Sequence, residues 1–302
     1  MQIAAIIPCY NEELTIGNVI RDFEKFLPEA TIYVFDNNST DKTAEIAKAS
    51  GATLVREKRL GKGFVIQSMF NKIDADVYVM VDGDDTYDLS KVKDMVTMII
   101  NDEADMIVGN RLNNCTGESF KTFHTFGNRL VRALINILFE TKLNDIMSGF
   151  RVMSGFFTKN INIMSSGFEV ETEMTIKALK YDYLIKEVDI NYKERPEGSY
   201  SKLDTFRDGY RVLKTIFLIF KDYKPLLFFS LCAFLSFCIS LFSSSIVITE
   251  FIRTRYITHV PLAILASGTM ILTIILFVTG IILDSMSRRV DELYHFMRKK
   301  VF

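Results

Sequence analysis

Four carboxylates lie within the seven-residue stretch 82–88, at the end of an apolar run: Asp82, Asp84, Asp85 and Asp88. Because like charges repel, a fold keeps this density only where a cation or backbone dipoles offset it. Oxygen ligands of this kind suit a hard divalent cation such as Mg²⁺ or Mn²⁺, and phosphate oxygens of a substrate often complete its coordination. The alternative is an acidic turn that only caps the following helix.

The surrounding chain alternates short apolar runs with amphipathic segments. Residues 3–7, 31–35, 53–55, 77–81 and 106–108 are predicted strands, and helices follow the first four. This alternation predicts an α/β fold with a mostly parallel sheet that is covered on both faces. Ligands bind beyond the carboxyl ends of such strands. One crevice is therefore expected to contain Tyr10, Asn11, Asp36, Lys62, Asp82, Asp84 and Arg111.

Two stretches near the C-terminus, 225–249 and 256–283, contain no Asp, Glu, Lys or Arg. Each exceeds the roughly 20 residues that cross a bilayer as a helix. The short linker 250–255 predicts a transmembrane hairpin. Lys221 and Lys224 precede the hairpin and a basic tail follows it, against two arginines in the turn. The positive-inside rule then predicts a multi-pass plasma-membrane protein with residues 1–224 and both termini in the cytoplasm.

The remaining bulk properties exclude several classes. The 36 basic and 37 acidic residues nearly cancel, and no basic stripe is present, so nucleic-acid binding is not expected. The four cysteines lack the spacing of a metal site, and the N-terminus lacks the pattern of a cleaved signal. The expected segments are a catalytic domain over 1–205, an amphipathic juxtamembrane helix over 206–224, the hairpin over 225–283, and an amphipathic tail over 284–302. The tail either mediates self-association into a homo-oligomer or is a solvated helix.

Several motifs occur together in a characteristic order. IIPCYNEE (6–13), FDNNSTDKT (35–43), GKG (61–63) and VDGDDTY (81–87) resemble glycosyltransferase family 2, which has the Rossmann-like GT-A fold. Further motifs, VGNR (108–111), NDIMSGFR (144–151), FEVETEM (168–174) and SYSKL (199–203), resemble its polyprenyl-phosphate branch. That branch includes dolichyl-phosphate mannose synthases and bacterial enzymes that load glucose or similar sugars onto undecaprenyl phosphate. The resemblance covers about residues 1–215.

The resemblance implies a donor site. Asp84 is then a catalytic metal ligand for Mg²⁺ or Mn²⁺, and Asp82 is its partner. Asp36 contacts the base, although capping with Ser39 and Thr40 is an alternative. Lys62 lies between two glycines that allow close backbone approach to a ligand. The implied nucleotide-sugar site consists of Pro8, Tyr10, Asn11, Glu12, Asp36, Asn38, Lys62 and Asp82.

The implied acceptor is a lipid monophosphate, which is already ionised near pH 7 and needs orienting cations more than a strong base. The candidates that bind it are Arg111, Lys121 and Lys202, with Thr125 as a hydroxyl donor and Arg129 and Arg151 as second choices. Arg111 is favoured, and an ordinary surface position is the alternative for each. Asp145 matches the acidic position that in inverting relatives serves as a base or orients the acceptor, so it is predicted to be catalytic. Capping of a helix is the alternative for Asp145.

The predicted function is inverting transfer of one sugar from a nucleotide sugar to polyprenyl phosphate on the cytoplasmic face. UDP-glucose or UDP-N-acetylglucosamine with undecaprenyl phosphate is favoured, and GDP-mannose with dolichyl phosphate stays open. A processive polysaccharide synthase generally needs a QxxRW-like motif, and this chain contains no Trp. From another class, a non-catalytic membrane scaffold with a transferase-like fold also stays open.

Overall fold

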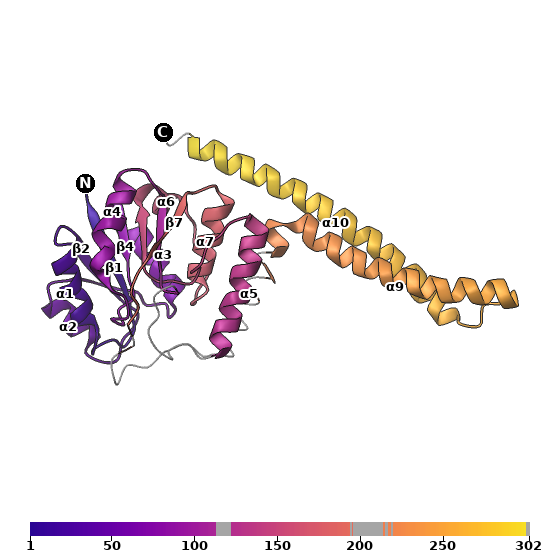
Figure 1. The fold of residues 1–302 in the computed structure, drawn as a ribbon, viewed down its shortest axis with the longest axis horizontal. Coiled ribbons are helices and arrows are strands. Elements are labelled where there is room, and N and C mark those ends of the chain that lie inside the picture. Colours follow the sequence, from indigo (N-terminus) through magenta and orange to yellow (C-terminus); the bar gives the residue numbers. More distant parts are fainter. Residues whose placement is uncertain (113–121, 194, 196–213, 215–216, 219, 300–302) are drawn as a thin grey trace. The chain divides into compact units, whose positions relative to one another are not determined.

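The five predicted strands and two further ones form one seven-stranded sheet, in the order β3-β2-β1-β4-β6-β5-β7. Figure 1 shows this sheet with helices around it. β1 pairs in parallel with β2 and β4, β2 with β3, and β5 with β7. Only β6 is antiparallel to its neighbours β4 and β5. The mostly parallel sheet is therefore confirmed. The strands are β1 Ile3–Cys9, β2 Thr31–Asp36, β3 Thr53–Arg56, β4 Val77–Met80, β5 Met106–Asn110, β6 Arg151–Ser154 and β7 Ile185–Asp189.

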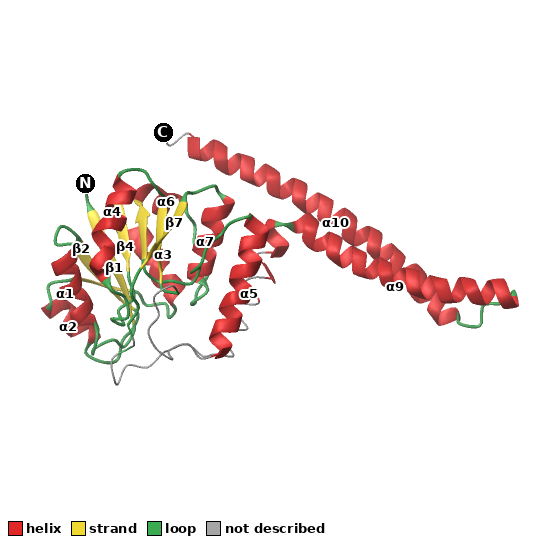
Figure 2. Ribbon diagram, viewed as in Figure 1, coloured by secondary structure: helices red, strands yellow, loops and turns green. Residues whose placement is uncertain are grey.

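Helices cover both faces of this sheet (Figure 2). One hydrophobic cluster joins the sheet to α1 and α4 through side chains such as Phe23 and Met95. The other joins it to α3, α6 and α7 through side chains such as Met69, Phe157 and Met174. The helices are α1 Ile16–Phe26, α2 Thr43–Ala49, α3 Lys62–Lys72, the 3-10 helix η1 Leu89–Lys91, α4 Val92–Ile100, α5 Thr122–Phe139, α6 Gly155–Asn160 and α7 Val170–Lys180.

The computed structural model describes residues 1–112, 122–193, 195, 214, 217–218 and 220–299. The chain divides into two units, Met1–Leu213 and Lys214–Phe302. The expected juxtamembrane helix over 206–224 lies largely outside the described residues. Its described members 214, 217–218 and 220–223 are helical.

The second unit contains two long helices, α9 Pro225–Thr254 and α10 Val260–Lys299. They pack antiparallel, because Ser236 Oγ donates to the carbonyl of Thr269 (2.9 Å) and Ser240 Oγ to that of Ala266 (2.7 Å). Arg255, with φ of 61°, ends α9 in the left-handed region. Both helices are long and apolar enough to cross a membrane. The second apolar stretch and most of the amphipathic tail belong to the single helix α10.

Candidate active site

Asp82 and Asp84 follow β4 directly, and each carboxylate is held by a cation from another part of the chain. Lys62 Nζ lies 2.6 Å from Asp82 Oδ1. Arg195 Nη2 lies 2.5 Å from Asp84 Oδ2, and Thr86 Oγ1 donates to Asp84 Oδ1 at 2.6 Å. The acid cluster thus meets the start of α3 and the segment that follows β7.

Lys62 bridges two carboxylates, because its Nζ also lies 2.5 Å from Glu171 Oε1 at the start of α7. The flanking glycines make this placement possible. Gly61 has φ of +136°, and a Cβ on Gly63 would lie 2.0 Å from the carbonyl oxygen of Ser165. Burial disfavours the charged form of Lys62, but the carboxylates of Asp82 and Glu171 outweigh it and raise its pKa. Lys62 therefore stays protonated at the centre of the site.

The surroundings of Asp84 disfavour the negative charge of its carboxylate. Burial raises the pKa of Asp84, and the charge of Asp82 raises it further. A divalent cation would offset this charge. The described residues contain no group of three or more His, Cys, Asp or Glu arranged for a metal. The two aspartates would therefore hold Mg²⁺ or Mn²⁺ only together with oxygens from substrate or water, which is common for Mg²⁺.

The other two acids of the cluster have local roles. Asp85, with φ of 57°, accepts a hydrogen bond from Asn18 Nδ2 at 2.9 Å. Asp88 accepts one from the backbone N–H of Ser90 at 2.9 Å and caps η1.

The loops after β1 and β2 lie together, as expected for the donor site. Asn11 and Asn38 both adopt positive φ, 53° and 63°. The backbone N–H of Asn11 donates to Ser39 Oγ (3.0 Å), and that of Thr40 donates to Asn11 Oδ1 (2.8 Å). Asp36 is buried and accepts from the N–H of Ser39 at 3.1 Å, so the capping contact is also present.

The rest of the predicted donor loop alternates between buried and exposed side chains. Pro8 is inside β1 beside Phe35 of β2, and Glu12 is buried. Tyr10, directly after β1, is 40% exposed. Asn37 links this region to the lysine loop, because its Oδ1 accepts from the N–H of Gly61 at 2.8 Å.

Asp145 and Arg111, which the sequence assigned to separate tasks, form one bidentate ion pair. Arg111 Nε lies 2.7 Å from Asp145 Oδ2, and Arg111 Nη2 lies 3.0 Å from Oδ1. The backbone N–H of Asp145 donates to Glu187 Oε1 at 2.7 Å, which fixes the loop. Burial disfavours the carboxylate of Asp145, but Arg111 outweighs it and lowers the pKa. A carboxylate held in this way is a weak base.

Arg151 is wrongly predicted as a phosphate-binding side chain. It is fully buried, and its guanidinium donates to the carbonyls of Ser148 (3.0 Å), Ile146 (2.7 Å) and Glu171 (3.0 Å). Burial lowers its pKa to about 10. Arg151 therefore joins the Asp145 loop to α7 and is not accessible to an acceptor.

The other predicted acceptor residues are only partly described. Arg129 is exposed on α5. Thr125 belongs to α5, but the structure does not describe its side chain. Lys121 and Lys202 lie outside the described residues. Their assignment to the acceptor remains a prediction.

Three residues of the site were missed by the sequence analysis: Glu171, Arg195 and Tyr87. The hydroxyl of Tyr87 accepts from the N–H of Gly149 at 2.8 Å, and Arg111 lies over its ring. Glu171 stands in FEVETEM and Tyr87 in VDGDDTY, so the motifs had pointed to their neighbourhood. Arg195 had no signal, because its partner Asp84 is 111 residues away.

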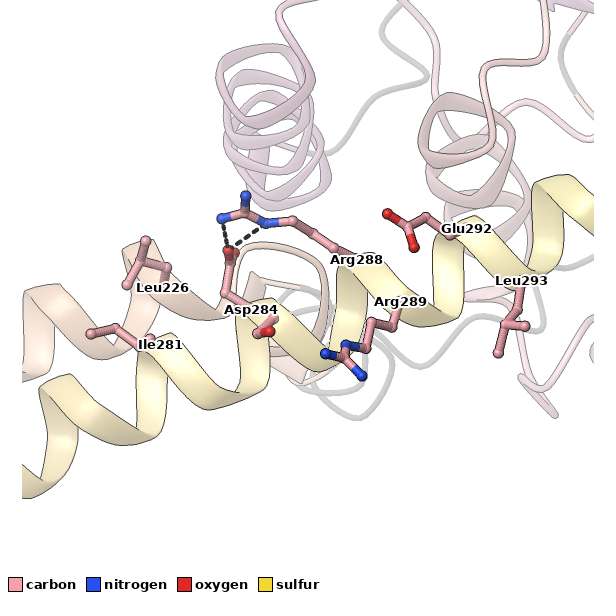
Figure 3. Close-up of a pocket in the computed structure, with 8 residues that line it drawn as sticks. Leu226, Ile281, Asp284, Arg288, Arg289, Glu292 and Leu293 are labelled. Carbon is pink, nitrogen blue, oxygen red and sulfur yellow. Dashed lines mark hydrogen bonds and ion pairs between the residues drawn. The ribbon is translucent and has the colours of Figure 1, made fainter.

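A separate cavity of about 990 Å³ lies within the second unit (Figure 3). Arg288 Nε donates to Asp284 Oδ2 at 2.9 Å on its edge. None of the predicted site residues lines it. Its walls consist of Leu226 of α9 and Ile281, Asp284, Ser285, Arg288, Arg289, Glu292 and Leu293 of α10.

Comparison with known sequences settles the family. Residues 4–161 match glycosyl transferase family 2. The chain belongs to this family. Protein RfbJ of Shigella flexneri is 50% identical over 122 residues, which is 40% of this chain and 95% of that protein.

Two archaeal relatives extend the likeness. Glycosyltransferase AglJ of Haloferax volcanii is 28% identical over 301 residues, 96% of this family 2 chain and 98% of AglJ. A dolichyl-phosphate hexose transferase of the same organism is 28% identical over 214 residues, 71% of this chain and 92% of that protein. The predicted membership of family 2, with a likeness to its polyprenyl-phosphate branch, is confirmed.

The solved structures confirm the GT-A fold. Glucosyl-3-phosphoglycerate synthase of Mycobacterium tuberculosis, crystallised with Mn²⁺, UDP and glucosyl-3-phosphoglycerate, superposes with a TM-score of 0.60 at 22% identity. The match covers 72% of this chain and 79% of that one. At this identity the likeness concerns the fold.

Proposed function

We propose that this family 2 glycosyltransferase is an inverting, metal-dependent hexosyltransferase. It transfers one sugar from a nucleotide diphosphate sugar to polyprenyl phosphate at the cytoplasmic face of the plasma membrane. The observation that carries the proposal is the acid cluster with Lys62 at the carboxyl edge of a GT-A sheet, in a chain that also contains two membrane-length helices. The dolichyl-phosphate hexose transferase among its relatives favours a lipid phosphate, and the UDP and Mn²⁺ bound by the structural neighbour favour a UDP-sugar.

The donor binds along the carboxyl ends of β1, β2 and β4. The loops that contain Tyr10, Asn11 and Asn38 hold the nucleoside, and Asp36 contacts the base. Asp82 and Asp84 hold Mg²⁺ or Mn²⁺, which would stabilise the charge on the departing diphosphate. Lys62 adds a fixed positive charge beside this position, because Glu171 holds it there.

The acceptor phosphate attacks the anomeric carbon. A bond forms between a phosphate oxygen and that carbon, the bond from the carbon to the diphosphate oxygen breaks, and the nucleoside diphosphate leaves with the electron pair. No proton needs to be removed from a phosphate that is already ionised. The lowered pKa of Asp145 agrees with such an acceptor, because Asp145 orients Arg111 instead of serving as a strong base. Arg111 then orients the phosphate.

The decisive experiment measures transfer of label from a panel of UDP- and GDP-sugars into organic-extractable lipid. Purified full-length protein, undecaprenyl phosphate and Mn²⁺ are combined, with EDTA as the control. One donor should give an EDTA-sensitive, mild-acid-labile product. A GDP-mannose product formed only with dolichyl phosphate would replace the favoured substrates. Nucleotide binding without transfer to either lipid would contradict the acceptor assignment, and absence of both would favour a non-catalytic scaffold.

A further inference from the structure

Both oxygens of the Asp84 carboxylate already have donors. Thr86 Oγ1 lies 2.6 Å from Oδ1, and Arg195 Nη2 lies 2.5 Å from Oδ2. The Asp84 side chain is only 7% exposed, so solvent screens this ion pair weakly. The transfer reaction proposed above does not account for Arg195.

A divalent cation held by Asp84 would bind the same carboxylate directly. A guanidinium that remained on Oδ2 would then place a second cation within a few ångströms of the ion. Inside a poorly screened site that repulsion is strong. Asp84 therefore favours one of the two cations at a time.

Lys62 differs from Arg195 in this respect. Its Nζ contacts Glu171 as well as Asp82, at 2.5 and 2.6 Å. If a metal ion bound Asp82, Lys62 would still have the buried carboxylate of Glu171 as its ion-pair partner. Lys62 can stay when the metal binds, because Glu171 holds its ammonium group and the start of α3 packs closely against the backbone of Ser165 and Ser166.

Arg195 follows a segment that runs beside the acid cluster. The backbone N–H of Lys193 donates to the carbonyl of Thr86 at 2.8 Å, and Tyr192 pairs with Tyr87 as an isolated antiparallel bridge. Arg195 lies two residues beyond Lys193. Its guanidinium can leave Asp84 through side-chain rotation while these backbone contacts remain.

We infer that Arg195 and a divalent cation are alternative counter-ions of Asp84, so that Arg195 sets the affinity of the site for metal. This inference rests on the proposed function, because it requires Asp84 to be a metal ligand. Arg195 is a residue that tunes the metal site, and it couples metal binding to the segment after β7.

The test is a Mn²⁺ titration of the full-length protein in detergent without nucleotide, followed by electron paramagnetic resonance of unbound Mn²⁺ at about pH 8, where protons compete little for carboxylates. Arg195→Gln should bind Mn²⁺ about tenfold more tightly than the wild type, because the competing ion pair is gone. Lys193→Gln removes the same charge from an exposed side chain in the same segment and should stay within about twofold. Arg195→Lys keeps a competing cation and should fall between the two.

The inference would be overturned if Arg195→Gln bound Mn²⁺ no more tightly than the wild type. The same holds if none of the variants binds Mn²⁺ with or without UDP, an outcome that also removes the metal from the proposed function. Sugar transfer is measured separately on the wild type. If the wild type transfers sugar and Arg195→Gln has unchanged Mn²⁺ affinity, the proposed function is supported and the inference is refuted. If Arg195→Gln binds Mn²⁺ more tightly but the wild type transfers no sugar, the inference is supported and the proposed function is refuted.

Discussion

Asp84 and Asp85 are neighbours with the same side chain and different surroundings. Asp84 is buried between Thr86 and Arg195, and its pKa is raised by burial and by Asp82. Asp85 points to Asn18 on α1. The difference arises from backbone direction, because Asp85 has a positive φ and Asp84 does not. The environment of each carboxylate therefore decides which one suits a metal.

This contrast gives a matched pair of substitutions. Asp84→Asn should lower sugar transfer by at least about 10²-fold, because it removes a charge that compensates the metal and the diphosphate. Asp85→Asn should keep nearly full activity, because Asn tolerates the left-handed backbone and can still accept from Asn18. Both are compared by initial rates at saturating Mn²⁺ and by circular dichroism for folding. Full activity in Asp84→Asn would remove it from the metal site.

The Asp145–Arg111 pair makes stability depend on pH. The pKa of folded Asp145 lies below that of the unfolded chain, so its ionised form stabilises the protein above about pH 4, and this contribution is lost as the pH falls further. Asp145→Asn removes the carboxylate partner of the partly buried Arg111. It should cost about 3 kcal/mol at pH 7, which is roughly 6–12 °C in Tm, and progressively less below about pH 4.

Circular dichroism melts between neutral and acidic pH measure this effect, since the chain has no Trp for fluorescence. Asp94→Asn, at an exposed acid of α4, is the control and should change stability by less than about 0.5 kcal/mol at every pH. A cost of Asp145→Asn that did not change with pH would exclude the ionised pair as its source.

At the scale of elements, close contact between α3 and the loop before α7 determines where Lys62 lies. A Cβ on Gly63 would meet the backbone oxygen of Ser165 at 2.0 Å, and backbone cannot yield as a side chain can. Gly63→Ala should therefore displace the start of α3 and lower transfer by about tenfold or more, since positioning errors near 1 Å cost this much. Gly17→Ala in α1, where a Cβ meets nothing nearer than 3.5 Å, should be neutral or slightly stabilising. Equal rates in the two variants would contradict this role of the α3 contact.

The sequence predicted the elements better than the contacts between them. Five parallel strands and their loops followed from apolar runs that end in polar residues, and this local pattern is retained in the fold. β6 and β7 were missed: β6, RVMS, has only two apolar residues in a row, and β7, IKEVD, has two charged residues and a final aspartate. The Asp84–Arg195 pair and the burial of Arg151 depend on long-range packing, so no local pattern contains them.

At the scale of the whole chain, the two units present different surfaces. The catalytic unit buries its apolar side chains in two clusters on either face of the sheet. The apolar windows of α9 and α10 are only 22% and 6% buried, although the helices contact each other through Ser236 and Ser240. A core helix of a soluble protein would be mostly covered by its own chain. The exposed apolar side chains of the two helices support the membrane association proposed above.

Topology can be measured directly by cysteine labelling in intact cells. In a variant with the four native cysteines replaced by serine, Tyr256→Cys places a thiol in the exposed turn between α9 and α10, and Glu29→Cys places one on an exposed turn of the catalytic unit. If the hairpin spans the plasma membrane with the catalytic unit inside, a membrane-impermeant maleimide should modify Tyr256→Cys in intact cells, and Glu29→Cys only after lysis. Labelling of both before lysis would place the catalytic unit outside, where nucleotide sugars are not supplied. Protection of the two thiols until lysis would mean that the hairpin does not cross the membrane. The positive-inside argument would then fail, and lipid transfer at the cytoplasmic face would require a hairpin that lies along the membrane surface.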